Sequence, residues 1–165
     1  MAVRPVNTLP DRVLKARAEE VGDLSEGELV ADLLETMEAS PACVGLAAPQ
    51  IGVSRRVIAV DVSAHPKTTV SHGLVVLIDP VIVEASGREV GREGCMSVPD
   101  LTANVARATS LVVRGHTPEG DDLIIATEGF EARAFQHEID HLDGMLILDR
   151  VDSLTTDVFR RRVYK

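Results

Sequence analysis

The chain has 165 residues, of which 45% are hydrophobic and only 2% aromatic, with a mean hydropathy of +0.10. This length suits one folded domain with an aliphatic core, so we expect a single domain over residues 1–165. A formal net charge of −9 argues against nonspecific binding of DNA or of an anionic membrane surface.

The N-terminal residues and the two cysteines are the features of the sequence that bear on where in the cell the protein is located. Residues 1–10 lack the apolar segment of a signal peptide, and no apolar run reaches the ~18 residues of a membrane span. We therefore expect a cytoplasmic protein. A thiol there serves as a metal ligand, a nucleophile or a core filler more often than as half of a disulfide.

Two helices are predicted in the first 40 residues. The first covers about 11–21. The second covers about 25–40, because Ser25 and Glu28 have the spacing of a capping box and Pro41 follows its end. Apolar residues recur at helical spacing along this second segment, which predicts a buried face.

Runs rich in β-branched residues predict the strands 57–62, 74–78, 81–84, 111–114 and 123–127. Helices are expected over 130–142, ending before Gly144, and over 154–164 at the C-terminus. Short connections between the strands favour antiparallel or mixed pairing. The predicted fold class is α+β, with these strands packed around a central helix and with a C-terminal helix.

The central helix carries the pattern H-E-x-x-H at His137, Glu138 and His141. On a helix, two side chains four residues apart lie one turn apart on the same face, about 6 Å from each other. Both imidazoles can then bind one metal ion, and Glu138 can reach a water bound to it. The alternative is a pair of ordinary helix residues, one exposed and one in the core.

A catalytic metal site usually has three protein ligands and one position for water. The residues alone leave the third ligand open among Cys95, His65, His72 and His116. Cys95 lies in the glycine-containing, turn-like segment 93–99, where a thiolate would be a strong ligand. An isolated cysteine is also often a small buried hydrophobic residue.

Three segments together resemble the peptide deformylase family. Residues 43–50 are similar to its G-x-G-L-A-A-x-Q, although alone they would also suit a packing loop. Residues 93–99 are similar to E-G-C-L/M-S-x-P, and residues 136–144 to Q-H-E-x-D-H-L-x-G. The resemblance implies one catalytic domain over 1–165 that removes the N-formyl group from the formyl-methionine of newly synthesised bacterial polypeptides and releases formate.

The same resemblance implies the roles of the site residues. The metal ligands would be one thiolate and two imidazoles: Cys95, His137 and His141. The ion would be Fe²⁺ in the working enzyme, although such a site also suits Zn²⁺, Ni²⁺ or Co²⁺. A hydroxide formed at the metal would attack the formyl carbon, with Glu138 as general acid and base. The donors to the developing oxyanion would be the Gln50 side chain and the Met96 backbone N–H.

The substrate peptide would lie extended and pair as an added strand. Its partners would be backbone groups of Val44, Gly45, Leu46 and Gly94. Candidate walls for the methionine side chain are Val44, Phe130, Ala134 and His137. Arg133, on the same helix, would run along this wall or pair with an acidic residue.

Two features depart from the family pattern. Cys43 replaces the first glycine of G-x-G, and its side chain would narrow the groove or alter the dihedrals of the loop. We predict that active protein has no Cys43–Cys95 disulfide, because that bond would remove a metal ligand. The basic residue that often follows the cysteine motif is missing before Arg107, so peptide contacts beyond the first residues should be weaker or differently organised.

A basic cluster lies at the C-terminus: Arg160, Arg161, Arg162 and Lys165. It is either a solvated helix face or a contact with ribosomal RNA near the nascent-chain exit. We expect a monomer that contacts neither membrane nor DNA. Two other functions are a zinc metallopeptidase and a catalytically silent, metal-stabilised binding module. The E-G-C motif argues against the first, and the presence of Gln50 and Glu138 argues against the second.

Overall fold

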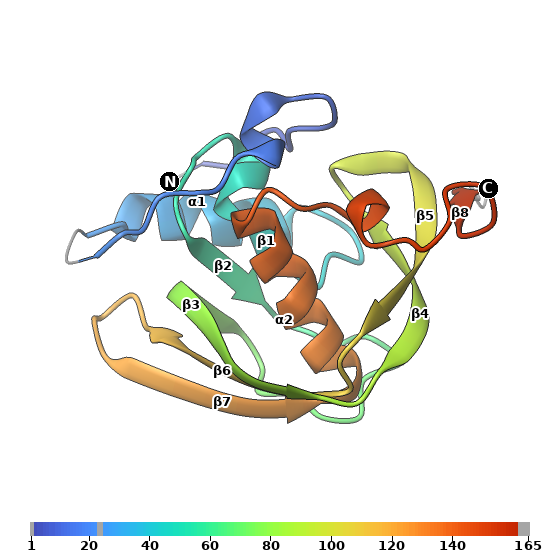
Figure 1. Ribbon diagram of the computed structural model, residues 1–165. Helices are drawn as coiled ribbons and strands as arrows, with labels where there is room; N and C mark the ends of the chain where they lie inside the picture. The colour runs from blue at the N-terminus through green and yellow to red at the C-terminus, as the bar shows by residue number, and fades with distance from the viewer. Residues whose placement is uncertain (1, 23–24, 162–165) are drawn as a thin grey trace.

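The computed structural model of the protein describes residues 2–22 and 25–161, which form two antiparallel sheets and two α-helices (Figure 1). The first sheet has five strands in the order β1-β2-β3-β6-β7, and the second has three in the order β4-β5-β8. Every pair of neighbouring strands within these sheets is antiparallel. The predicted α+β class with antiparallel strands is confirmed.

The helices are α1 (Gly27–Glu38), α2 (Gly129–Leu142) and the short 3-10 helices η1 (Arg12–Lys15), η2 (Ala48–Ile51) and η3 (Ile147–Asp149). The strands are β1 (Gly45–Ala47), β2 (Val57–Val60), β3 (Val75–Ser86), β4 (Glu89–Cys95), β5 (Val98–Arg107), β6 (Ser110–His116), β7 (Asp122–Glu128) and β8 (Val158–Arg160). Within the described ranges, no helix is long and apolar enough to cross a membrane.

Helix α2 lies between the two sheets (Figure 1) and packs against β1, β2, β6 and β7. Phe135, Ile139 and Leu142 on this helix are buried in one cluster with Ile58 and Val113 from the five-stranded sheet. Each fully buried side chain of this size stabilises the fold by about 1.5–3 kcal/mol. The same helix therefore anchors the core and carries the three residues of H-E-x-x-H.

The two strands predicted at 74–78 and 81–84 are one strand, β3, with irregular pairing between them. Asp79 adopts φ +51°, and its carboxylate accepts the backbone N–H groups of Val21 at 2.8 Å and Gly22 at 2.9 Å. These bonds hold the chain in a bulge, so the Asp-Pro pair bends the strand without ending it.

The segment 93–99, predicted to be turn-like, belongs mostly to two strands that the sequence did not reveal. β4 ends at Cys95, β5 begins at Val98, and only Met96 and Ser97 form the turn between them. Glycines at two of the seven β4 positions lower its β-propensity, which is why the strand was missed.

The helix predicted over 11–21 is wrong beyond its first turn, η1. The Ala18 N–H donates to the Leu142 carbonyl at 2.8 Å, and the Glu19 N–H donates to the Ser54 carbonyl at 3.1 Å. Because backbone groups that a helix would pair internally are bonded to α2 and to the segment before β2, the chain stays extended here.

The second predicted helix is confirmed as α1, but its capping box is wrong. The N-cap residue is Glu26, and no side chain caps the helix. The helix starts two residues after Ser25, so the Ser25 hydroxyl is out of register with the first turn. The Glu26 carboxylate instead lies 3.4 Å from Arg55.

The predicted C-terminal helix is wrong over its described part, and its residues 162–164 lie outside the described ranges. Asp157 closes a turn, because its N–H donates to the Ser153 carbonyl at 3.0 Å and its carboxylate accepts the Ser153 N–H at 3.0 Å. Ser, Thr and Asp side chains compete with helical hydrogen bonds in this way. The chain then pairs with β5 as β8.

Gly144 is confirmed as the residue that ends α2, and it generates a stability prediction. It has φ +73°, and a Cβ placed there would lie 2.5 Å from the Lys15 carbonyl oxygen. We expect Gly144→Ala to lower the free energy of unfolding by more than about 3 kcal/mol, measured by urea denaturation, because a backbone clash adds to the strained φ. Gly120→Ala is the control: its φ is +91°, but its Cβ would meet nothing within 4 Å. Equal losses in both variants would contradict the clash.

Candidate metal centre and active site

Cys95, His137 and His141 meet where β4 ends against α2. One ligand atom of each lies within 4.8 Å of the others, and Cys95 Sγ is 3.4 Å from His141 Nε2. In the described part of the chain, no other three His, Cys, Asp or Glu side chains converge in this way. One thiolate and two imidazoles are a donor set typical of catalytic zinc and other late divalent metals.

An unpaired buried oxygen also fits a water bound to the ion. Glu138 Oε1 is buried without a hydrogen-bond partner among the described residues, whereas His141 Nδ1, which is also unpaired, lies on the side of the ring opposite the Nε2 that faces Cys95 Sγ. Such atoms cost free energy unless water or a ligand satisfies them. The residues present therefore fit a divalent metal ion.

Glu93 fixes the ring of His137. Its Oε1 lies 2.8 Å from His137 Nδ1, which leaves Nε2 of that ring for the metal group. A carboxylate on the second nitrogen of a ligand histidine sets the ring orientation and raises its basicity. Glu93 is itself held by two bonds of 3.0 Å from Arg107 and one of 2.6 Å from Arg133. Of the two arrangements expected for Arg133, the structure therefore shows pairing with an acidic residue, Glu93.

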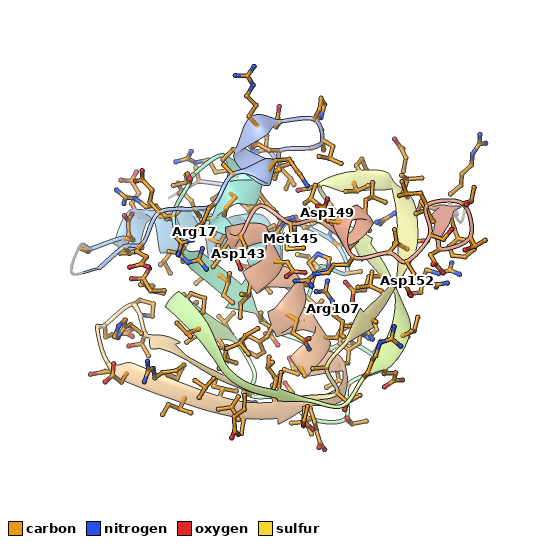
Figure 2. The ribbon with its side chains drawn as sticks, in the orientation of Figure 1. Arg17, Arg107, Asp143, Met145, Asp149 and Asp152 are labelled. Carbon is orange, nitrogen blue, oxygen red and sulfur yellow. The ribbon has the colours of Figure 1, made fainter. Side chains whose placement is uncertain are left out.

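Arg107 extends this network to the helix. It lies between α2 and the three-stranded sheet (Figure 2) and forms an ion pair with Asp140. Arg150 donates to the same carboxylate at 3.0 and 2.7 Å. No sequence pattern predicts this network, since Arg107 and Glu93 are 14 residues apart and meet only through the pairing of β4 with β5.

The two glutamates beside the metal group differ in acidity. Burial alone would raise the pKa of Glu93, but hydrogen bonds from His137 and Arg107 hold it well below its usual range. Among the described residues Glu138 accepts no such bond at Oε1, and burial raises its pKa to about 7. A carboxyl group that titrates near neutral pH is suited to accept and return a proton.

The two histidines also differ. Burial, with the nearby charge of His137, lowers the pKa of His141 well below its usual value, so this ring is held in the neutral form that binds metals. Burial alone would lower the pKa of His137, but Glu138, Cys95 and Glu93 raise it well above its usual value. A metal ion bound at His137 must therefore displace a proton.

Gln50 lies beside the metal group on η2. Its Nε2 is 3.7 Å from Cys95 Sγ and donates to Ser97 Oγ at 3.1 Å, while its Oε1 accepts the Ala47 N–H at 3.0 Å. The bond to Ala47 defines which end of the amide is the oxygen, so the NH₂ donor faces the site. Ser97, whose hydroxyl contacts that NH₂ group, was given no role from the sequence.

A pocket of about 300 Å³ opens in front of the metal group. All but one of the residues predicted to bind substrate line it: Val44, Gly45, Gly94, Phe130 and Ala134. The exception is Leu46, whose side chain is fully buried in the core with α1. His137, Glu138, Gln50 and Met96 also border the pocket.

Two edge strands flank this pocket. β1 is at one edge of the five-stranded sheet and β4 at one edge of the three-stranded sheet, and they border the pocket at Gly45 and Gly94. Edge strands present backbone groups to which an extended peptide can add. At Gly45, a Cβ would lie 2.6 Å from Glu138 Oε2, so only glycine lets that carboxylate lie against β1.

The other histidines weighed as third ligands lie outside the metal group. His65 lines the pocket and stacks on Phe130, with ring centroids 4.1 Å apart. His72 bonds through Nδ1 to the buried Glu131, and His116 lies at the far end of β6. The stacked His65 is a pocket wall that the sequence did not predict.

Cys43 borders the pocket as a free thiol, and Cys95 is also free. The absence of a Cys43–Cys95 disulfide in active protein stays a prediction. The Cys43 thiol donates to the Gly45 carbonyl at 3.1 Å. Burial and the negative charge of Glu138 raise the pKa of Cys43 to about 11. The thiol therefore stays protonated and is a poor nucleophile at neutral pH.

Residues 3–157 match the family model of polypeptide deformylase. The chain belongs to this family. It is 41% identical over 164 residues to the peptide deformylase of Syntrophobacter fumaroxidans, covering 98% of this chain and 94% of that protein. It is 45% identical over 166 residues to the peptide deformylase of Desulforudis audaxviator, covering 98% and 99%.

Solved structures of polypeptide deformylases agree with this assignment. The Met-Ala-Ser-bound class I type b enzyme from Acinetobacter baumannii matches with a TM-score of 0.84 and 35% identity, covering 91% of this chain and 99% of that chain. A peptide deformylase from Legionella pneumophila matches with a TM-score of 0.82 and 36% identity, covering 93% and 88%. The family resemblance carried by the three motifs is confirmed.

The ion network gives a second prediction. In Arg107→Met, the buried carboxylates of Glu93 and Asp140 lose their shared counter-ion, so the free energy of unfolding should fall by about 3 kcal/mol in urea denaturation. The control is Arg114→Met, an exposed arginine on β6, which should change stability by less than about 0.5 kcal/mol. Comparable losses in the two variants would show that the network does not hold the fold.

Proposed function

We propose that this protein is a peptide deformylase. It removes the N-formyl group from the formyl-methionine of nascent polypeptides and releases formate, and residues 1–165 act as one catalytic domain. The observation that carries this proposal is the convergence of a Cys-His-His group, a partly unpaired glutamate and an amide donor on one pocket between two edge strands. Membership of the polypeptide deformylase family supports it.

We assign the metal ligands to Cys95, His137 and His141. Thiolate and imidazole donors suit Fe²⁺, Zn²⁺, Ni²⁺ and Co²⁺, and we propose Fe²⁺ for the working enzyme because the family resemblance implies it. When bound, such an ion lowers the pKa of a coordinated water to about 7 and polarises a carbonyl oxygen.

Glu138 is the proton-transfer residue in this proposal. Its carboxylate takes the proton of the attacking water and delivers it to the nitrogen of the departing peptide amine. The unpaired Oε1 and the pKa near 7 support both steps. The absence of a side chain at Gly45 leaves room for this carboxylate beside the peptide.

Gln50 and Met96 stabilise the negative charge that develops on the formyl oxygen. The Gln50 NH₂ group, already oriented by Ala47 and Ser97, donates one hydrogen bond. The Met96 N–H, in the turn after β4, donates the other. A preorganised donor of this kind contributes about 3 kcal/mol to the stability of the transition state.

The peptide lies between β1 and β4 and pairs with backbone of Val44–Leu46 and Gly94. Its methionine side chain fills the pocket beside Val44, Phe130, Ala134 and His137. Leu46 contributes only backbone, since its side chain belongs to the core. The stacked pair of His65 and Phe130 closes one wall.

We also propose that the enzyme acts as a monomer in the cytoplasm, where its substrate is made. Contact with the ribosome through the basic C-terminal segment is part of this proposal. Of that cluster, Arg160 and Arg161 are described and both are exposed, on an extended segment. Arg162 and Lys165 lie outside the described residues.

Formate release from formyl-Met-Ala-Ser tests the proposed function. The protein is reconstituted anaerobically with Fe²⁺ or Zn²⁺, and formate and free peptide are quantified. We expect formate with an intact peptide bond. Cleavage at the peptide bond would instead indicate a metallopeptidase. Binding of metal with no cleavage of either bond by either form would indicate a binding module.

Glu138→Gln tests the assigned proton transfer. Because the amide cannot accept the proton of water, kcat should fall by about 10²–10⁴-fold while metal content stays unchanged. Glu119→Gln, in the exposed turn between β6 and β7, serves as control and should retain activity. Deformylation by Glu138→Gln at the rate of this control would remove Glu138 from the mechanism.

A further inference from the structure

Cationic side chains gather at the pocket although the whole chain has a net charge of −9. Most lysines and arginines in the described ranges lie within 4.0 Å of a carboxylate oxygen. Those in residues 2–22 and 25–161 that do not are Arg12, Lys67, Arg92, Arg114, Arg160 and Arg161. Three of these, Lys67, Arg92 and Arg161, line the pocket.

Arg161 reaches the pocket because β8 pairs with β5. The Arg161 N–H donates to the Asp100 carbonyl at 2.9 Å, which continues the pairing beyond the last residue of β8. The guanidinium lies over Gly94, where a Cβ would be 2.6 Å from Nη2, and Nη2 donates to the Cys95 carbonyl at 3.4 Å. Its remaining N–H donors have no hydrogen-bond partner among the described residues.

Arg92 is held beside it. Its Nε donates to Asn104 Oδ1 at 3.1 Å, and its guanidinium carbon lies 3.6 Å from the centroid of the Phe159 ring. A hydrogen bond and a cation–π contact orient the group. The two terminal nitrogens of Arg92 have no partner in the described part of the chain.

The acidic residues of the pocket do not neutralise these groups. The Glu93 carboxylate is bonded to Arg107, Arg133 and His137, and Glu138 lies on the opposite side of the groove against β1. Lys67 adds a further positive charge from the connection between β2 and β3.

We propose that Arg92 and Arg161, with Lys67, bind a carboxylate of the substrate downstream of formyl-methionine. The inference rests on the proposed deformylase activity. A guanidinium matches a carboxylate in geometry and charge, and both arginines retain free donors directed at the pocket. Because Arg161 lies over Gly94, whose backbone is proposed to pair with the peptide, the carboxylate is either an acidic side chain one or two residues after methionine or the free C-terminus of a tripeptide.

Matched substrates test this and separate the two sources. The neutral reference is formyl-Met-Ala-Ser amide. Formyl-Met-Asp-Ser amide and formyl-Met-Ala-Asp amide place the carboxylate on a side chain, and formyl-Met-Ala-Ser with a free C-terminus places it on the backbone. We expect kcat/KM for at least one of the three to exceed the reference by about 3–10-fold, mainly through KM, because two or three exposed charge pairs contribute. The preference should shrink as salt increases.

Variants show whether the positioned guanidinium groups cause the preference. Arg161→Gln and Arg92→Gln should each bring the ratio of acidic to neutral substrate toward one. Arg161→Glu should reverse it in favour of formyl-Met-Ala-Lys amide. Arg160→Gln is the matched control, since Arg160 is the neighbouring residue and does not line the pocket.

Equal kcat/KM for the acidic and neutral peptides in the wild-type enzyme would overturn the inference. So would a loss of preference in Arg160→Gln as large as that in Arg161→Gln, since net charge alone would then explain it. Failure to release formate from every substrate would instead reject the proposed function, so the two failures are distinct.

Discussion

The buried carboxylate of Glu93 is the contact on which the arrangement of the site depends. It joins Arg107 on β5 and Arg133 and His137 on α2, while it lies on β4 itself. Taking this charge out of water is costly, and the cost is offset only because all its partners are in place. The effect of Glu93 is therefore geometric: it fixes α2 against β4, so the sulfur of Cys95 at the end of β4 meets the histidines of the helix.

The carboxyl groups of Glu93 and Glu138, both near His137, have different acidities because their surroundings differ. Glu93 accepts hydrogen bonds on both oxygens, which hold its pKa well below the usual range and keep it ionised. Glu138 has one oxygen, Oε1, without a partner among the described residues and the other, Oε2, against the backbone of Gly45, and burial raises its pKa to about 7. This separation of two acids by their environment supports the roles proposed for them.

The sequence predicted the parts of the site that depend on local spacing. The two histidines share a helix face wherever that helix forms, and the family motifs then singled out Cys95 and Gln50. The ion network and His65 could not be read in this way, because they depend on strand register and on a loop folding back. The fold shows the same limit. The glycines of β4 lower its β-propensity, so the sequence does not predict this strand. The bulge in β3 is held by N–H groups distant in sequence, so the sequence predicts two strands there. The basic C-terminal segment has the composition of a helix but forms a strand because it pairs with β5.

The pairing of β8 with β5 connects two features that are unrelated in the sequence. One is the absence of a basic residue just after the cysteine motif, and the other is the C-terminal segment, which is extended where a helix was predicted. Along an extended segment, side chains alternate between faces. Phe159 and Arg161 therefore lie on the same face of the three-stranded sheet, and Arg160 lies on the opposite face. On the shared face, Phe159 contacts Arg92 and Arg161 lies over Gly94. A helix would have spread these residues around its circumference. As an extended segment, the tail can place Arg161 in the groove and leave Arg160 for another surface, so the proposed substrate contact and the proposed ribosome contact need not compete for the same residue.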